Sequence, residues 1–350
     1  MPNIKQPLLG FSATVLIIVI SLAFISLFTF PTLAGWVAYG LLCLIPMQIV
    51  VGVLWRTELP SVAASRPQPA RGFLQLLVTI VAGAVIGPLY FFIMGGGIGP
   101  PTPMLAQCTI VSVVVMFGLA IVWGGWPFNV VFKNPLVAGI ATWISAYVVN
   151  ALLFRIFFNY DFMKGAPVYV ASLDPQGMFN AWSALVFYVT ALSVMFLIIH
   201  FDLWPLTTVP SVMKQPVLGV VWTAVILALA APLFLIGTQV LAIDPVTFLV
   251  NVPIPFIFGT IIVLNLLQNS LFASLSQPVK GIANTLAAGV IGSVLAQLYK
   301  ALMPTVTGAL ASGPPPYEAE IWLATALLSV TFPFLIFGAE FFKFWPLKSD

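Results

Sequence analysis

The phrase Lys5-Gln6-Pro7-Leu8-Leu9-Gly10 opens the first long apolar segment of a 350-residue chain, and related phrases open four later segments. These are Pro67-Gln68-Pro69-Ala70-Arg71-Gly72, Lys133-Asn134-Pro135-Leu136-Val137-Ala138-Gly139, Lys214-Gln215-Pro216-Val217-Leu218-Gly219 and Ser276-Gln277-Pro278-Val279-Lys280-Gly281. Successive prolines of the phrase are 62, 66, 81 and 62 residues apart, which is the room that two membrane-crossing helices and their loops require. The phrase therefore predicts five tandem copies of one helical hairpin.

The composition indicates a protein that is embedded in lipid. Charged residues make up 6% of the chain, hydrophobic residues make up 61%, and the mean hydropathy is +1.13, whereas ordinary soluble domains are roughly 25% charged. The net charge of +3 is scattered. Without a run or stripe of basic residues to neutralise phosphates, nucleic acid is not an expected partner.

Apolar runs of about 20 residues predict ten membrane spans. They cover residues 8–30, 35–55, 73–94, 105–126, 136–158, 178–200, 217–237, 246–272, 282–303 and 321–341. We expect an all-α polytopic membrane protein whose ten transmembrane helices form five tandem two-helix repeats around a central axis. Residues 1–350 would then be a single transmembrane domain, with repeats at 5–66, 67–132, 133–213, 214–275 and 276–350.

The basic residues predict the orientation in the membrane. Ten spans place both termini and every repeat opening on one face, which holds nine of the 12 basic residues. The other face holds Arg155, Lys164 and Lys300. By the positive-inside rule, both termini lie in the cytoplasm and the protein resides in the inner or plasma membrane.

Polar side chains recur at one depth in the first helix of every copy. Six or seven residues after the proline of the phrase stand Thr14, Gln75, Thr142, Thr223 and the pair Asn284 and Thr285. A small or polar residue recurs about two turns deeper, at Ser21, Gly83, Asn150, Ala230 and Gly292. If the odd-numbered helices face a common axis, these positions form rings that select the solute of a pore. The alternative is that the threonines bond to their own helix and that the small residues are packing faces.

Three further residues are candidates for a pathway. Asn251 precedes two prolines that interrupt the eighth span, and irregular backbone at membrane depth is tolerated where protein or a water-filled cavity surrounds it. Arg155 and Lys300 lie near the extracytoplasmic ends of odd-numbered helices, where they would draw anions towards a mouth. A simple kink at Asn251, and snorkelling of the two basic side chains to lipid headgroups, are the alternatives.

The sequence gives little support for catalysis or for a bound cofactor. Cys43 and Cys108 lie apart in apolar stretches, which indicates neither a disulfide framework nor a CxxC site. His200 is the only histidine, and no nucleophile stands beside it. We expect no enzyme activity, no cofactor and no metal site, and a lipid-modifying enzyme is the weakest alternative.

The architecture of five like-oriented hairpins resembles the tellurite-resistance and slow-type anion channel family. The resemblance spans nearly the whole chain but rests on the helix arrangement rather than on a shared motif. It implies a pore lined by the odd-numbered helices, passage of small anions, a central aromatic gate and a trimer. The aromatic residues of the odd-numbered spans, such as Phe11, Phe73, Trp143 and Trp222, lie close to the cytoplasmic end, so the sequence does not place that gate.

Two functions of different classes follow from these patterns. The first is a membrane transport protein, a channel or facilitator for a small solute such as an anion, which would pass between the odd-numbered helices. Its partners would be the bilayer, the solute and other copies of the chain. The alternative is a non-catalytic integral-membrane subunit of a larger membrane complex.

Overall fold

The structure, a computed structural model, describes residues 4–314 and 316–348 and is built from ten long helical spans. The odd-numbered spans are α1 (Leu8–Ile25), α5 (Ala70–Ile93), α8 (Pro135–Phe157), α10 (Val217–Leu235) with η8 (Ile236–Val240), and α13 (Val279–Val306). The even-numbered spans are Phe30–Leu54, Pro103–Val122, α9 (Ala181–His200), Pro245–Leu266 and Glu318–Phe341. Span 2 contains α2 (Phe30–Thr32), η1 (Leu33–Val37), α3 (Ala38–Ile49) and η2 (Val50–Leu54), and span 4 contains α6 (Pro103–Phe117) and η3 (Gly118–Val122). Span 8 contains α11 (Pro245–Asn251), α12 (Pro253–Ile261) and η9 (Ile262–Leu266), and span 10 contains α14 (Glu318–Ala324), η10 (Thr325–Thr331), α15 (Phe332–Ile336) and η11 (Phe337–Phe341). Each span is long and apolar enough to cross a membrane, as predicted.

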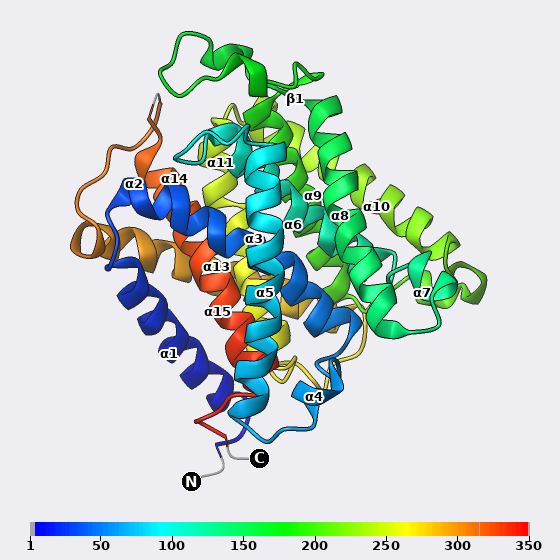
Figure 1. Cartoon of the computed structure of the whole chain (residues 1–350). Coiled ribbons are helices and arrows are strands. Elements are labelled where there is room, and N and C mark those ends of the chain that lie inside the picture. Colours follow the sequence, from blue (N-terminus) through cyan, green and yellow to red (C-terminus); the bar gives the residue numbers. More distant parts are fainter. Residues whose placement is uncertain (1–3, 315, 349–350) are drawn as a thin grey trace.

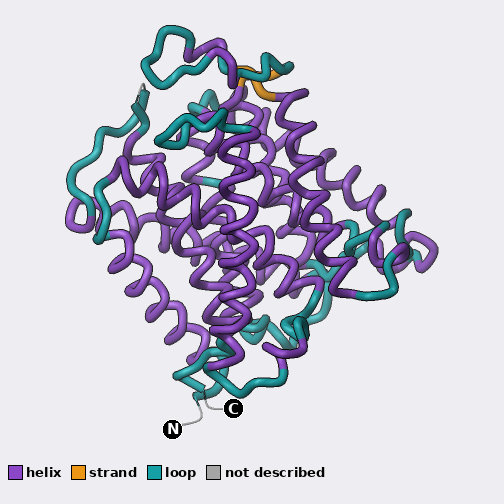
Figure 2. The backbone as a smooth tube through the Cα atoms, viewed as in Figure 1, coloured by secondary structure: helices purple, strands orange, loops and turns teal. Residues whose placement is uncertain are grey.

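The spans lie side by side, with loops joining their ends (Figures 1 and 2). Figure 1 shows that α1 begins at the same end of the bundle as the last helical residues of the chain, and we call this the terminal end. Short helices α4 (Ser61–Ala64) and α7 (Phe128–Val131) lie in loops, and a two-residue parallel pair joins β1 (Phe158–Asn159) to β2 (Phe179–Asn180).

Proline marks the start of most spans, in agreement with the sequence. In four copies of the phrase its proline is the residue just before the first helical one, whereas Pro135 is itself the first helical residue. Three even-numbered spans begin after a polar N-cap, since the side chains of Thr102, Asn180 and Asp244 accept hydrogen bonds from backbone N–H groups of the first turn. Because spans 3 and 9 begin directly after the proline of the phrase, they start three residues before the predicted positions.

The burial of the spans reverses the expected arrangement. In the odd-numbered spans 22–39% of the apolar window is buried, against 61–78% in the even-numbered spans. The even-numbered spans therefore form the interior, and the odd-numbered spans surround them. The expectation that odd-numbered helices face the axis was wrong. Both sets of helices are apolar on all sides, and lipid tails are as apolar as a helix interface, so the sequence pattern does not distinguish a helix that faces lipid from one that is buried.

The inner spans contact one another in a closed order. Span 2 contacts span 4, span 4 contacts span 6, span 6 contacts span 8, span 8 contacts span 10, and span 10 contacts span 2. Each outer span packs on the inner span that precedes it in the chain, and α1 packs on span 10. The result is an inner ring of five helices inside an outer ring of five.

The glutamine of the repeated phrase fastens four of the five outer spans to the inner ring. In four copies its Nε2 donates to the carbonyl of the last residue of an inner span: Gln6 to Leu266 at 2.8 Å, Gln68 to Phe341 at 2.7 Å, Gln215 to Val122 at 2.9 Å and Gln277 to His200 at 3.0 Å. The Oε1 atom of the same glutamine accepts from the N–H of the glycine four residues later. In the third copy Asn134 caps its own helix, and the Trp55 indole donates to the Pro135 carbonyl at 3.1 Å instead.

The glycine of the phrase provides room for this contact. An added Cβ atom would overlap the residue that follows an inner span or its neighbour: Leu266 and Leu267 at Gly10, Phe342 at Gly72, Trp55 at Gly139, Trp123 at Gly219 and Phe201 at Gly281. Span 1 is thus joined to span 8, span 3 to span 10, span 5 to span 2, span 7 to span 4 and span 9 to span 6. Every hairpin holds the inner helix of the hairpin three copies further around the ring.

Candidate binding cavity

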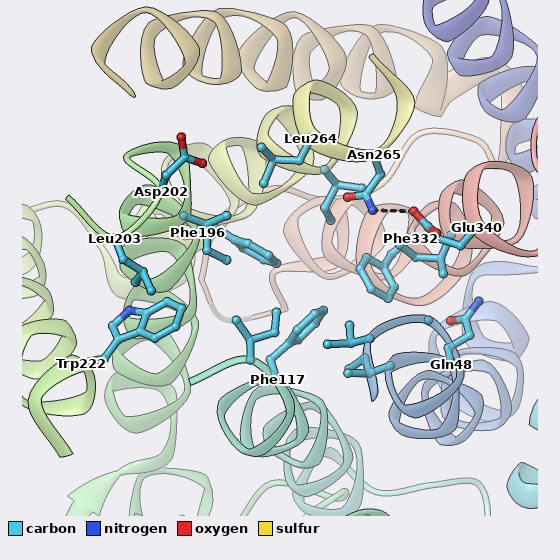
Figure 3. Close-up of a pocket in the computed structure, with 17 residues that line it drawn as sticks. Gln48, Phe117, Phe196, Asp202, Leu203, Trp222, Leu264, Asn265, Phe332 and Glu340 are labelled. Carbon is cyan, nitrogen blue, oxygen red and sulfur yellow. Dashed lines mark hydrogen bonds between the residues drawn. The ribbon is translucent and has the colours of Figure 1, made fainter. Parts of the chain in front are cut away.

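A cavity of about 570 Å³ lies between the terminal ends of the inner spans. Figure 3 shows it surrounded by helices of the inner ring, with side chains pointing in from each side. All five inner spans contribute to its lining, and from the outer ring Trp222 of α10 joins them. Its volume lies in the range of about 300–1,000 Å³ that is typical of small-molecule sites.

The lining falls into two layers at matching positions of the inner spans. The mouth layer is the last-but-one residue of each inner span: Val53, Ile121, Ile199, Asn265 and Glu340. One turn further from the terminal end lies the second layer: Ile49, Phe117, Phe196, Ile261 and Ile336. Four inner spans end in a π-helical turn, and α9 ends without one, which is why its second-layer residue stands three positions before the mouth residue rather than four.

Three phenylalanine rings meet at the inner part of the cavity. The ring centroids of Phe117 and Phe196 are 5.4 Å apart, and those of Phe117 and Phe332 are 5.9 Å apart, both in edge-to-face geometry. Figure 3 shows the three rings converging from spans 4, 6 and 10. The three rings are thus packed against one another at one part of the cavity wall.

Three polar side chains of the cavity, Gln48, Asn265 and Glu340, lie on the side of spans 2, 8 and 10. The Glu340 carboxylate accepts a hydrogen bond from Asn265 Nδ2 at 3.1 Å, and its second oxygen lies 3.2 Å from Lys343 Nζ. Gln48 is fully buried, and its Nε2 donates to the Pro333 carbonyl at 3.0 Å. Its Oε1 atom is buried with no hydrogen-bond partner within the described residues.

Asp202 stands at the opposite side of the mouth, just after α9. Its carboxylate lies 3.1 Å from Lys280 Nζ and accepts a hydrogen bond from Gln277 Nε2 at 2.8 Å. Partial burial alone would raise the pKa of Asp202, but these two donors hold it below its ordinary value. The carboxylate is therefore charged at neutral pH.

The residues predicted to form the polar ring lie outside this cavity. Thr14 and Thr142 donate to the carbonyls of Gly10 and Ala138 in their own helices, each at 2.8 Å, as the alternative interpretation expected. Thr223 and Thr285 are half-buried on outer spans.

The two amides of that set hold loops at the terminal end. Gln75 Nε2 donates to the Thr57 carbonyl at 2.6 Å, and Asn284 Nδ2 lies 3.4 Å from Asn269 Oδ1. Thr57 and Asn269 both have positive φ, in the turns that follow spans 2 and 8. Buried amides on the outer helices therefore stabilise these turns.

The deeper set packs the outer spans onto the inner ones. Asn150 is fully buried and donates to the Tyr90 hydroxyl at 2.6 Å and to the Cys108 carbonyl at 2.8 Å. At Gly292 an added Cβ atom would overlap the Pro255 carbonyl of α12. This depth is a packing level between the two rings.

Of the three candidates near the end opposite the terminal end, Lys300 and Asn251 contact each other. Lys300 donates a short hydrogen bond to Asn251 Oδ1, where α11 ends and α12 begins. Arg155 is exposed near the end of α8. Among the described residues, no group of three or more His, Cys, Asp or Glu side chains could hold a metal ion.

Sequence reasoning missed the residues that line the cavity because it aligned the copies at their openings. The loops between the two helices of a copy differ in length, so matching positions of the inner spans have no constant distance from the proline. Alignment of the spans at their other ends places Asn265 and Glu340 in register. This register was available from the sequence once the ends of the helices were known.

The comparisons with known proteins identify no relative of the chain. No family model matches it, no curated protein matches it, and no solved structure matches it.

Proposed function

We propose that the chain is a membrane transport protein that conducts a small solute along the axis between its even-numbered helices. The observation that carries this proposal is the cavity to which all five inner spans contribute at matching positions. A site shared by every element of a ring lies on the axis of that ring, where a pathway across the membrane must run. The odd-numbered helices, which were expected to line the pathway, would separate it from lipid.

The proposed arrangement is five hairpin repeats related by quasi-fivefold symmetry about the membrane normal. The glutamine and glycine contacts support it, because each copy of the phrase meets the inner span three copies further on. If each copy contacts the inner span three copies further on, five such contacts return to the first copy. A closed ring of five equivalent units requires this pattern. By the positive-inside rule, the distribution of basic residues supports a cytoplasmic position for the terminal end, and with it for the mouth of the cavity.

The three phenylalanines at the inner part of the cavity would act as the constriction of this pathway. Apolar rings exclude water and ions from a narrow passage, and small changes of ring rotamer would open it. The aromatic gate that the family resemblance implies would then lie on even-numbered rather than odd-numbered helices.

The test is flux in proteoliposomes that contain the purified protein. We expect solute-dependent flux from the wild type and at least a severalfold faster flux from Phe117→Ala, because truncation widens the constriction. Phe92→Ala is the matched control, since Phe92 is 67% exposed on the outer helix α5. Equal flux from wild type, Phe117→Ala and empty liposomes for a panel of cationic, neutral and anionic solutes would contradict the proposal and favour a non-catalytic subunit.

A further inference from the structure

The charges that line the cavity are acidic. Of the 17 lining residues, all of which belong to the described part of the chain, Asp202 and Glu340 are the charged ones, and Lys, Arg and His are absent from the lining. Lys280 and Lys343 pair with these carboxylates from outside the lining. A solute inside the cavity therefore faces carboxylate oxygens and no cationic side chain.

The backbone adds to this polarity. All five inner spans end around the mouth, and the C-terminus of a helix carries a partial negative charge that acts within its last turn. The mouth layer lies in that last turn. The helix ends therefore disfavour an anion in the cavity and favour a cation.

A buried acceptor without a partner points to a ligand that donates hydrogen bonds. Gln48 is fully buried and lines the cavity, and its Nε2 donates to the Pro333 carbonyl, whereas its Oε1 has no hydrogen-bond partner among the residues that the structure describes. Figure 3 shows the Gln48 amide on the side of the cavity where Phe332 and Glu340 lie. A buried polar atom without a partner is costly, so a donor bound here would be stabilised.

Apart from Asn265, the rest of the wall is apolar and aromatic. Phe117, Phe196, Phe332 and Trp222 present rings to the cavity, and a cation is attracted to the face of such rings. The Trp222 indole nitrogen has no hydrogen-bond partner within the described residues, and Figure 3 shows it on the edge of the ring away from the cavity centre. Most of this wall offers no oxygen ligand to a bare metal ion, whereas an organic body would fill it.

We propose that the cavity binds a small organic cation, an ammonium group on an apolar body, with the ammonium between Glu340 and Gln48 Oε1 and the body among the phenylalanine rings. This inference rests on the proposed function and names its class of solute. It replaces the anion that the family resemblance implied.

The test is equilibrium binding to the full-length protein in detergent with three probes of similar shape. They are phenethylammonium, neutral phenethyl alcohol and the anion phenylacetate. We expect saturable binding and a raised Tm with phenethylammonium, binding about tenfold weaker or worse with the alcohol, since a hydrogen bond to a charged group is lost, and no binding of phenylacetate. Phenylacetate binding as tight as that of phenethylammonium, or no binding of any probe, would overturn the inference.

Variants then locate the ammonium group. Glu340→Gln and Gln48→Met should each weaken phenethylammonium binding by about tenfold, while Glu58→Gln, which removes an exposed carboxylate outside the lining, should leave it unchanged. Unchanged affinity in both Glu340→Gln and Gln48→Met would contradict the assigned position. The ligand-free Tm shows whether each variant is folded, and the probe series on the wild type decides the charge preference without any variant.

Binding and flux separate the two proposals. Binding of phenethylammonium without flux of any solute would uphold the cation site and contradict the conduit. Flux that favours phenylacetate over phenethylammonium would uphold the conduit and overturn the cation site.

Discussion

At the scale of single residues, the glutamine of the repeated phrase does what the sequence did not predict. Its proline stands at the start of each odd-numbered helix, and its glycine allows close contact with an inner span. The glutamine joins two distant segments, since Gln6 and Leu266 are 260 positions apart. Such a bond depends on which inner helix end lies beside the phrase, and a local sequence pattern carries no information about that.

We predict that Gln215→Leu lowers the free energy of unfolding by about 1–3 kcal/mol, because the Val122 carbonyl and the Gly219 N–H each lose a hydrogen-bond partner. The control is Gln297→Leu, at an exposed position of α13, which should change stability by less than about 0.5 kcal/mol. Thermal unfolding in one detergent compares the two. Equal stability of both variants would mean that the glutamine bridge is dispensable.

Asp202 gives a prediction about acid. Its pKa in the folded protein is lowered, so its contribution to stability is present above the unfolded pKa of about 3.9 and is lost as the pH falls through the folded pKa. We expect Asp202→Asn to reduce the Tm at neutral pH and to leave a shallower decline of Tm below about pH 4. A decline as steep as in the wild type would show that other carboxylates govern acid sensitivity.

At the scale of secondary-structure elements, the sequence predicted the number and approximate position of the spans. It could not say which face of each span turns inward, because the helices are apolar on all sides. The recurring small residues gave the best indication of where the helices pack against one another. The depth shared by Gly83, Asn150 and Gly292 is where outer helices cross inner ones, which matches the packing alternative rather than a pore ring.

Two of the three glycines of α13, Gly289 and Gly292, allow a matched test of this packing. We predict that Gly292→Ala destabilises the protein by about 1–3 kcal/mol or more, because its Cβ atom would overlap the Pro255 carbonyl. Gly289 on the same helix has open space around it, so Gly289→Ala should be neutral or stabilising by up to about 1 kcal/mol. Thermal unfolding distinguishes them, and a Gly292→Ala protein as stable as Gly289→Ala would contradict the close contact of α12 and α13.

At the scale of the whole molecule, the cavity and the cyclic contacts both involve the inner ring of even-numbered spans. The repeated phrase predicted five like hairpins, and the described contacts follow a rule with the same period. The cavity was beyond prediction, since Gln48, Phe117 and Glu340 belong to different copies, and their neighbourhood depends on which helices form the inner ring. The proposed pathway and the proposed cation both depend on that ring.

The most direct test of the account is cysteine labelling in proteoliposomes combined with flux. Ile121→Cys places a thiol in the mouth layer of the cavity, and Val81→Cys places one on the exposed surface of the outer helix α5, while the native Cys43 and Cys108 are buried. We predict that a water-soluble, membrane-impermeant thiol reagent applied from the terminal side labels Ile121→Cys and abolishes its flux, and that it leaves Val81→Cys unlabelled and active. Full flux through a completely labelled Ile121→Cys protein would contradict a pathway between the even-numbered helices.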